Sequence, residues 1–153
     1  MFRVLSSITV LSALLFGYPN TISDVKSQYY SIEQNIKNGN YTMVKKSQEY
    51  DNTGADFTAY RDRHNTIRKL VVETGSEDSY HKAEYSYTDS GLLLFTYNED
   101  NNVAGCSTTI RSYYSGTKVL KRASKVKKCD ISYHLPFRVD NPNKVIDNPD
   151  SFL

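Results

Sequence analysis

Two cysteines, Cys106 and Cys129, are the most reactive side chains of this sequence. They lack the C-x-x-C spacing of a redox motif, and two lone cysteines make a poor zinc site. In an oxidising compartment a pair of thiols usually becomes a disulfide, and closing a loop of this size stabilises a fold by about 3 kcal/mol. We therefore predict a structural Cys106–Cys129 disulfide if the chain is exported.

The turn signal Ser115-Gly116 lies midway between the two cysteines. A hairpin folded there brings both cysteines to its open end. A strict two-residue turn would place residue 125 opposite Cys106, so a longer loop or a bulge near Ala123-Ser124 is also expected.

Basic side chains dominate the second half of this hairpin, where no acidic residue occurs. They are Lys118, Lys121, Arg122, Lys125, Lys127 and Lys128. Such a cluster could attract an anionic lipid, a polysaccharide, a nucleic acid or an acidic protein surface. Tyr113 and Tyr114 add amphipathic rings beside it and complete the candidate binding set. Lysines also protect edge strands from aggregation, so a purely protective role stays open.

Motifs of the common catalytic sites are missing from the sequence. It has no G-x-S-x-G, H-E-x-x-H, P-loop or G-x-G-x-x-G pattern. His64, His81 and His134 are far apart in the chain and lack the spacing of metal ligands. The stretch 98–102 is rich in oxygen donors but lacks the pattern of an EF-hand, so we expect a solvated loop there. No catalytic residue, metal or cofactor is predicted.

The amino terminus predicts export. Arg3 precedes an apolar run from Val4 to Phe16, which suits the core of a signal peptide. This run is shorter than the roughly 20 residues that a membrane-spanning helix needs. We expect a signal peptide over residues 1–23, cleavage before Asp24, and a mature bacterial protein in the periplasm or the extracellular space, without a membrane span.

Composition bounds the class of the mature protein. After the leader, about 130 residues remain, which is enough for one modest core. The 13 tyrosines and the 39% of hydrophobic residues exclude the disordered class. A formal net charge of +2 gives no global imbalance, so nucleic acid is not an expected partner.

A helix is predicted at the start of the mature chain. Apolar residues recur at a spacing of four, three and four, which forms one stripe on a helix: Val25, Tyr29, Ile32 and Ile36. Thr21 and Asp24 resemble a capping box, and Asn38-Gly39 supplies the stop. The predicted helix therefore runs from Thr21 to Lys37.

Alternating patterns separated by turn signals follow the helix. They predict seven strands, at 41–50, 56–61, 67–74, 80–87, 92–97, 107–114 and 118–128. Short strands joined by tight turns favour an antiparallel meander, so the predicted fold class is α+β, with the helix packed on a meander of six to seven strands. Closure into a small β-barrel remains the alternative, because Val71-Val72 and 92–94 are apolar on both faces.

Alternation also predicts which side chains share a face. On one strand, the apolar face is formed by Ala83, Tyr85 and Tyr87 together with His81. On the next strand, it is formed by Leu93, Phe95 and Tyr97. The polar face is assigned Lys82, Glu84, Thr96 and Arg111.

From Pro136 onward we expect an extended tail without a helix, because proline lacks the backbone donor. The predicted divisions are thus 1–23, 24–135 and 136–153.

A series of short segments carries a resemblance to known proteins. They are a helix ending in Asn-Gly, Glu49-Tyr50, 54–60, 67–70, 83–87, 91–95 and Tyr113-Tyr114. In this order they resemble a group of small exported bacterial proteins of unassigned function. The resemblance covers roughly residues 25–122, implies a helix followed by a meander, and transfers no active site.

Taken together, these patterns predict an exported, non-enzymatic binding or inhibitor-like protein. Its expected partner is a protein or an anionic component of the envelope, engaged through the basic hairpin. Two alternatives remain open: a hydrolase-type enzyme, or a carrier of lipids or small ligands if the sheet closes into a barrel.

Overall fold

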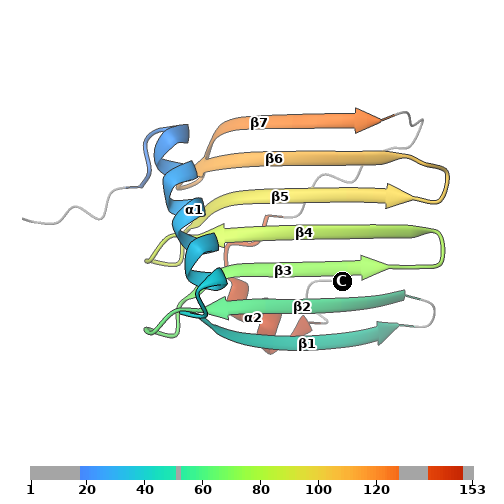
Figure 1. Cartoon of the computed structure of the whole chain (residues 1–153), viewed down its shortest axis with the longest axis horizontal. Helices are drawn as coiled ribbons and strands as arrows, with labels where there is room; N and C mark the ends of the chain where they lie inside the picture. The colour runs from blue at the N-terminus through green and yellow to red at the C-terminus, as the bar shows by residue number, and fades with distance from the viewer. Residues whose placement is uncertain (1–17, 51–52, 128–137, 150–153) are drawn as a thin grey trace, which may run out of the picture.

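The computed structural model describes residues 18–50, 53–127 and 138–149. Its elements are α1 (Ile22–Lys37), β1 (Thr42–Tyr50), β2 (Thr53–Arg61), β3 (Ile67–Gly75), β4 (Ser79–Tyr87), β5 (Leu93–Asn102), β6 (Ser107–Ser115), β7 (Lys118–Lys127) and α2 (Pro142–Asp147). All seven strands form one antiparallel sheet in chain order (Figure 1). The predicted helix followed by a meander is confirmed.

The sheet is open. Strands β1 and β7 are its two edges, and no ladder joins them within the described residues. The alternative of a closed barrel is therefore wrong, because the apolar residues on both faces of the sheet are covered by other elements instead of by closure.

Helix α1 begins and ends where its sequence predicts. The Thr21 hydroxyl accepts a hydrogen bond from the Asp24 amide at 3.1 Å, and the Asp24 carboxylate accepts one from the Thr21 amide at 3.1 Å. This capping box satisfies two of the amides left free at a helix start. The buried side chains of Val25 and Ile32 then pack on one face of the sheet, which we call the helix-side face.

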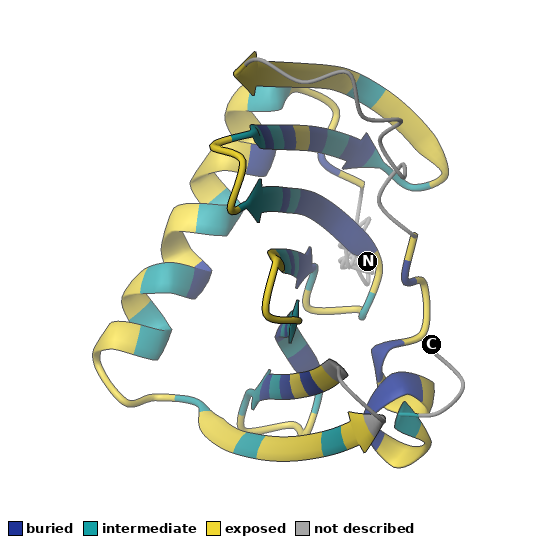
Figure 2. Ribbon diagram, turned by 90° about the vertical axis from the view of Figure 1, so that its right-hand side faces the viewer, coloured by how far each residue is buried: buried dark blue, intermediate teal, exposed yellow. Residues whose placement is uncertain are grey.

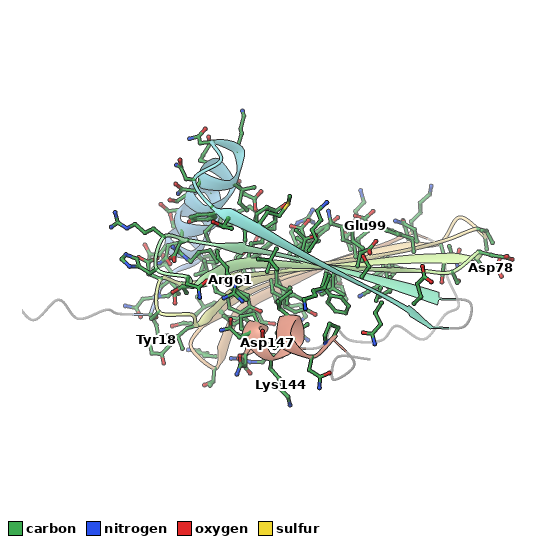
Figure 3. All side chains as sticks on the ribbon, turned by 90° about the horizontal axis from the view of Figure 1, so that it is seen from below. Tyr18, Arg61, Asp78, Glu99, Lys144 and Asp147 are labelled. Carbon is green, nitrogen blue, oxygen red and sulfur yellow. The ribbon has the colours of Figure 1, made fainter. Side chains whose placement is uncertain are left out.

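The opposite face, here called the far face, is covered by the carboxyl-terminal segment, for which the sequence predicts an extended tail. That prediction is wrong. Pro142 occupies the start of helix α2, where a missing backbone donor costs nothing, and Asn141 caps that helix. Val145 and Ile146 pack into the core of the far face. Figure 3 shows α1 and α2 on opposite sides of the sheet. The domain therefore has three layers, one more than the sequence predicts.

The apolar side chains are sorted between these two faces. Burial colours in Figure 2 show the inner strands dark and the edge strands β1 and β7 largely exposed. Phe57, Leu70, Val72 and Tyr85 form much of the far-face core. The central strands are thus buried on both faces, while each edge strand is exposed along much of its length.

A bulge in β5 changes the predicted faces. The β4–β5 register shifts between Ser86 and Tyr87, so Tyr87 pairs with Leu93 whereas Ser86 pairs with Phe95. Because one extra residue reverses the alternation, Leu93 joins the far-face core and Phe95 packs beneath α1. The prediction that Leu93 and Phe95 share a face is wrong. For the same reason Thr96 lies on the far face, opposite Tyr85.

Strand β5 extends well beyond its predicted end. The segment expected to be a loop continues to pair with β4 as far as Asn102 and with β6 as far as Asn101. The turn is confined to residues 103–105 and is closed by a hydrogen bond from the Gly105 amide to the Asn102 carbonyl, at 3.0 Å. Asn98, predicted to be solvated, is only 2% exposed.

The β6–β7 hairpin also departs in detail from its prediction. Ser115 pairs with Lys118, and the expected bulge lies beside Tyr113-Tyr114 instead of near Ala123. Ser107 therefore pairs with Lys127 at the open end of the hairpin, next to Cys106 in the chain. Cys129 lies outside the described residues, so the disulfide stays a prediction.

That disulfide is tested by thiol chemistry. In protein purified without reductant we expect neither cysteine to react with an alkylating reagent. The double variant Cys106→Ser/Cys129→Ser should lose about 3 kcal/mol of unfolding free energy in urea, because its unfolded chain is no longer cross-linked. Two reactive thiols in the oxidised protein would contradict the pairing.

The residues just before α1 take part in the fold. Gly116 has a φ of +58°, and a Cβ built there would lie 2.8 Å from Cε1 of Tyr18. The Tyr18 ring therefore packs directly on the β6–β7 turn. Cleavage before Asp24 would remove both this ring and Thr21, the residue that caps α1.

We expect Gly116→Ala to cost more than Gly105→Ala. Both glycines have positive φ, which costs alanine about 1–2 kcal/mol, but nothing lies within 4 Å of a Cβ at Gly105. The excess, on the order of 1 kcal/mol from displacing the Tyr18 ring, should appear in urea unfolding of the chain that begins at Tyr18. It should vanish in a Tyr18→Ala background; an excess that persists there would mean that another contact is responsible.

Candidate functional site

Exposed cations gather on the helix-side face at the β7 edge of the sheet. In the β6–β7 register Lys121 lies opposite Tyr113, Lys125 opposite Thr109, and Arg111 opposite Ala123. Because paired residues share a face, these cations lie on the same side of the sheet as α1. We call Arg111, Lys121 and Lys125 the basic strip.

A cavity of about 280 Å³ adjoins the basic strip. It lies where α1 crosses β5 and β6, and it is lined by Lys26, Tyr29, Tyr30, Glu84, Phe95, Tyr97, Arg111 and Tyr113. Three lining residues come from α1. Tyr29 and Tyr30 lie three and four residues after Lys26, so all three side chains lie on one face of the helix. Those from β5 and β6 alternate with a period of two. We call it the aromatic cavity.

The aromatic rings of this cavity pack against one another at tilted angles. The Phe95 ring centroid lies 4.8 Å from that of Tyr29 and 5.1 Å from that of Tyr113, with interplanar angles of 56° and 57°. Tyr30 meets Tyr29 at 5.6 Å and remains 62% exposed at the rim. Such tilted aromatic contacts are favourable in themselves, so the walls hold their positions without a ligand.

A buried ion network lies under the same helix. The Lys69 ammonium contacts a carboxylate oxygen of Glu33 on α1 at 2.6 Å and one of Glu84 on β4 at 2.8 Å. Lys82 contacts the second oxygen of Glu84, also at 2.8 Å. The network thus joins the helix to the sheet and fixes the carboxylate in the wall of the aromatic cavity.

Both buried members of the network remain charged. Burial by itself would lower the pKa of Lys69, but the carboxylates of Glu84 and Glu33 outweigh it and raise that pKa above its usual value. Burial would likewise raise the pKa of Glu84, yet Lys69 and Lys82 hold that pKa below its usual value. The positive charges of the two ammonium groups and the negative charges of the two carboxylates therefore cancel at neutral pH.

The charge that is left over at this site is positive. No described acidic side chain forms an ion pair with Arg111, Lys121 or Lys125. The same holds for Lys26 at the mouth of the aromatic cavity. The side chain of Glu99, on the same face (Figure 3), accepts a hydrogen bond from the Tyr97 hydroxyl at 2.8 Å. This end of the helix-side face is suited to attract anions.

The structure separates the site residues predicted from the sequence. Lys121, Lys125 and Lys127 share the helix-side face with Tyr113, whereas Arg122 lies on the far face and donates to the Ser112 hydroxyl at 3.2 Å. The Tyr114 ring is buried in the far-face core. Exposed Lys118 begins β7 at the turn, and Lys128, like Cys129, lies outside the described residues.

Sequence reasoning missed most of the aromatic cavity. Its signal was present as Lys26, Tyr29 and Tyr30 on one face of the predicted helix and as Arg111 and Tyr113 at alternating strand positions. That signal could not be used alone, because the bulge in β5 decides that Phe95 and Tyr97 face the helix. The crossing position of α1 decides which strands supply the rest.

The far face carries buried polar groups of its own. Thr96, Asn98 and Thr108 have side-chain atoms without a hydrogen-bond partner, including both polar atoms of the Asn98 amide. Groups of this kind destabilise a core unless water or a ligand satisfies them. Nearby, His81 Nδ1 lies 2.5 Å from a carboxylate oxygen of Asp100.

The described part of the chain has neither a metal-binding cluster nor a membrane-spanning helix. Across residues 18–50, 53–127 and 138–149, no cluster of three or more His, Cys, Asp or Glu side chains could hold a metal ion. No helix in those ranges has the length and apolar character to cross a bilayer.

No family model, curated protein or solved structure matches this chain. The resemblance to small exported bacterial proteins therefore stays a prediction.

The ion network yields a stability prediction. We expect Lys69→Met to lower the free energy of unfolding by roughly 3 kcal/mol, because Glu84 and Glu33 lose their shared cation. The depressed pKa of Glu84 stabilises the fold above pH 4.5, its ordinary value, and this stabilisation disappears as pH falls through the lower folded pKa. The gap between wild type and variant should therefore shrink in acid.

Urea unfolding between pH 3 and pH 7 measures this gap. The matched control is Lys45→Met, which removes an exposed lysine of β1 from the helix-side face, the face on which Lys69 lies. It should change stability by less than about 0.5 kcal/mol. A gap that is independent of pH would contradict an electrostatic role for Lys69.

Proposed function

We propose that this chain is an exported, non-enzymatic binding protein that engages an anionic macromolecule through the basic strip. The observation that carries the proposal is that Arg111, Lys121 and Lys125 are exposed on one face and that none of them forms an ion pair with a described acidic side chain. A positive surface of this kind raises the local concentration of polyanions and speeds their association.

A protective role for the edge strand does not account for this distribution. Lysines that prevent pairing between copies are needed only on the outermost strand. Arg111 lies on β6, the second strand from the edge, and its guanidinium carbon is held 5.0 Å from the centre of the Tyr97 ring. An arginine positioned by an aromatic ring beside two exposed lysines favours recognition of an anion.

Charge reversal tests the proposal. We expect the wild-type protein to bind an immobilised sulfated polysaccharide in low salt and to elute as salt screens the charges. Lys121→Glu/Lys125→Glu should weaken this binding at least tenfold, because attraction is replaced by repulsion at two positions.

The matched control is Lys45→Glu/Lys46→Glu, which makes the same change of net charge on exposed positions of β1, at the other edge of the sheet. Circular dichroism should show both variants folded. Equal weakening by the two double variants would assign the binding to net charge alone and would overturn the role of the basic strip, as would a wild-type protein that binds no polyanion.

A further inference from the structure

The aromatic cavity has the chemistry of a site for a single small ring. Its volume of about 280 Å³ is at the lower end of the roughly 300–1,000 Å³ of sites for drug-sized ligands. Four of its residues, Tyr29, Phe95, Tyr97 and Tyr113, offer aromatic rings, and Tyr30 stands exposed at the rim.

Cationic ligands are disfavoured there although aromatic rings surround the space. The negative faces of two rings already receive cations of the protein: Lys69 Nζ lies 5.8 Å from the centre of Tyr29, and Arg111 covers Tyr97. The Glu84 carboxylate is paired with two lysines. A quaternary ammonium group would therefore find neither a free negative ring face at those positions nor an unpaired carboxylate.

Polar groups without partners indicate a ligand that is rich in hydroxyls. The hydroxyls of Tyr29, Tyr30 and Tyr113 have no hydrogen-bond partner among the described residues, and Lys26 and Arg111 add charged donors. Burial, with Glu33 adding to it, raises the pKa of Tyr29, so its hydroxyl stays protonated and can donate. A sugar ring presents apolar C–H faces to aromatic walls and hydroxyls to such partners.

We propose that the aromatic cavity binds one acidic sugar unit of a polysaccharide whose neighbouring units lie along the basic strip. The inference rests on the proposed function and names its partner class. In the register of the sheet Tyr113, a cavity residue, lies opposite Lys121, so the cavity and the strip form one surface. The carboxylate of the bound unit faces Arg111 and Lys26, which have no described acidic partner.

The test compares three soluble probes by calorimetry in low salt: an oligomer of galacturonic acid, a neutral galactose oligomer of equal length, and an oligoglutamate of equal charge. We expect the uronic acid oligomer to bind at least tenfold more tightly than either of the others. Tyr30→Ala and Arg111→Gln should each weaken that binding about tenfold, which is the size of one lost ring contact or charge-assisted hydrogen bond.

Tyr30→Ala should leave the binding of oligoglutamate unchanged, because this exposed ring carries no charge. Tyr80→Ala, an exposed tyrosine on β4 outside the residues that line the cavity, is the matched control and should behave as wild type. If the uronic acid oligomer and oligoglutamate bind equally and Tyr30→Ala changes neither, the sugar site is wrong while the proposed function stands.

The remaining outcomes are equally decisive. Preference for oligoglutamate would overturn the inference in favour of an acidic protein partner. Binding of the neutral oligomer as tightly as the acidic one would overturn the requirement for charge. Failure of every probe to bind, together with no retention on the sulfated polysaccharide, would overturn both the sugar site and the proposed function.

Discussion

The contact of Lys69 with Glu33 and Glu84 is the constraint on which the helix-side face depends. A cation on β3 meets a carboxylate from α1 and another from β4, so helix and sheet can approach only where all three groups meet. Buried charges contribute little net stability once desolvation is counted, but an unpaired one is costly. The network therefore acts mainly on specificity: Val25 and Ile32 supply the apolar contact, and Lys69 sets where along the sheet it forms.

The aromatic cavity and the basic strip follow from that position. With α1 held over the central strands, Tyr29 reaches Phe95 while Tyr30 stays exposed beside Arg111. Strand β7 extends past the contacts of the helix, and its lysines remain in solvent. One docking geometry thus produces a partly enclosed aromatic site and an open cationic surface side by side, a combination that suits a charged polymer better than a small neutral ligand.

The far face shows why both sides of the central strands are apolar. Two-sided apolar strands left barrel closure open as the alternative fold, whereas α2 and its flanking residues cover the second side. The prolines from Pro136 onward predict a tail without a helix, yet Pro142 occupies the first position of α2, the one place in a helix where proline fits without loss. Both errors have one source, because a local pattern reports that a face is buried and does not report which element buries it.

Local chemistry in the sequence determined α1 and the strands: the Thr21–Asp24 capping box starts α1, and alternation between turn signals produces seven strands in meander order. It also determined the surplus of cations on β7. Tertiary structure decided the faces, because one bulged residue in β5 reverses every side chain after it and no residue type marks that bulge. It decided the site as well, since Tyr29, Phe95 and Arg111 are far apart in the chain and meet only when α1 packs across β5 and β6.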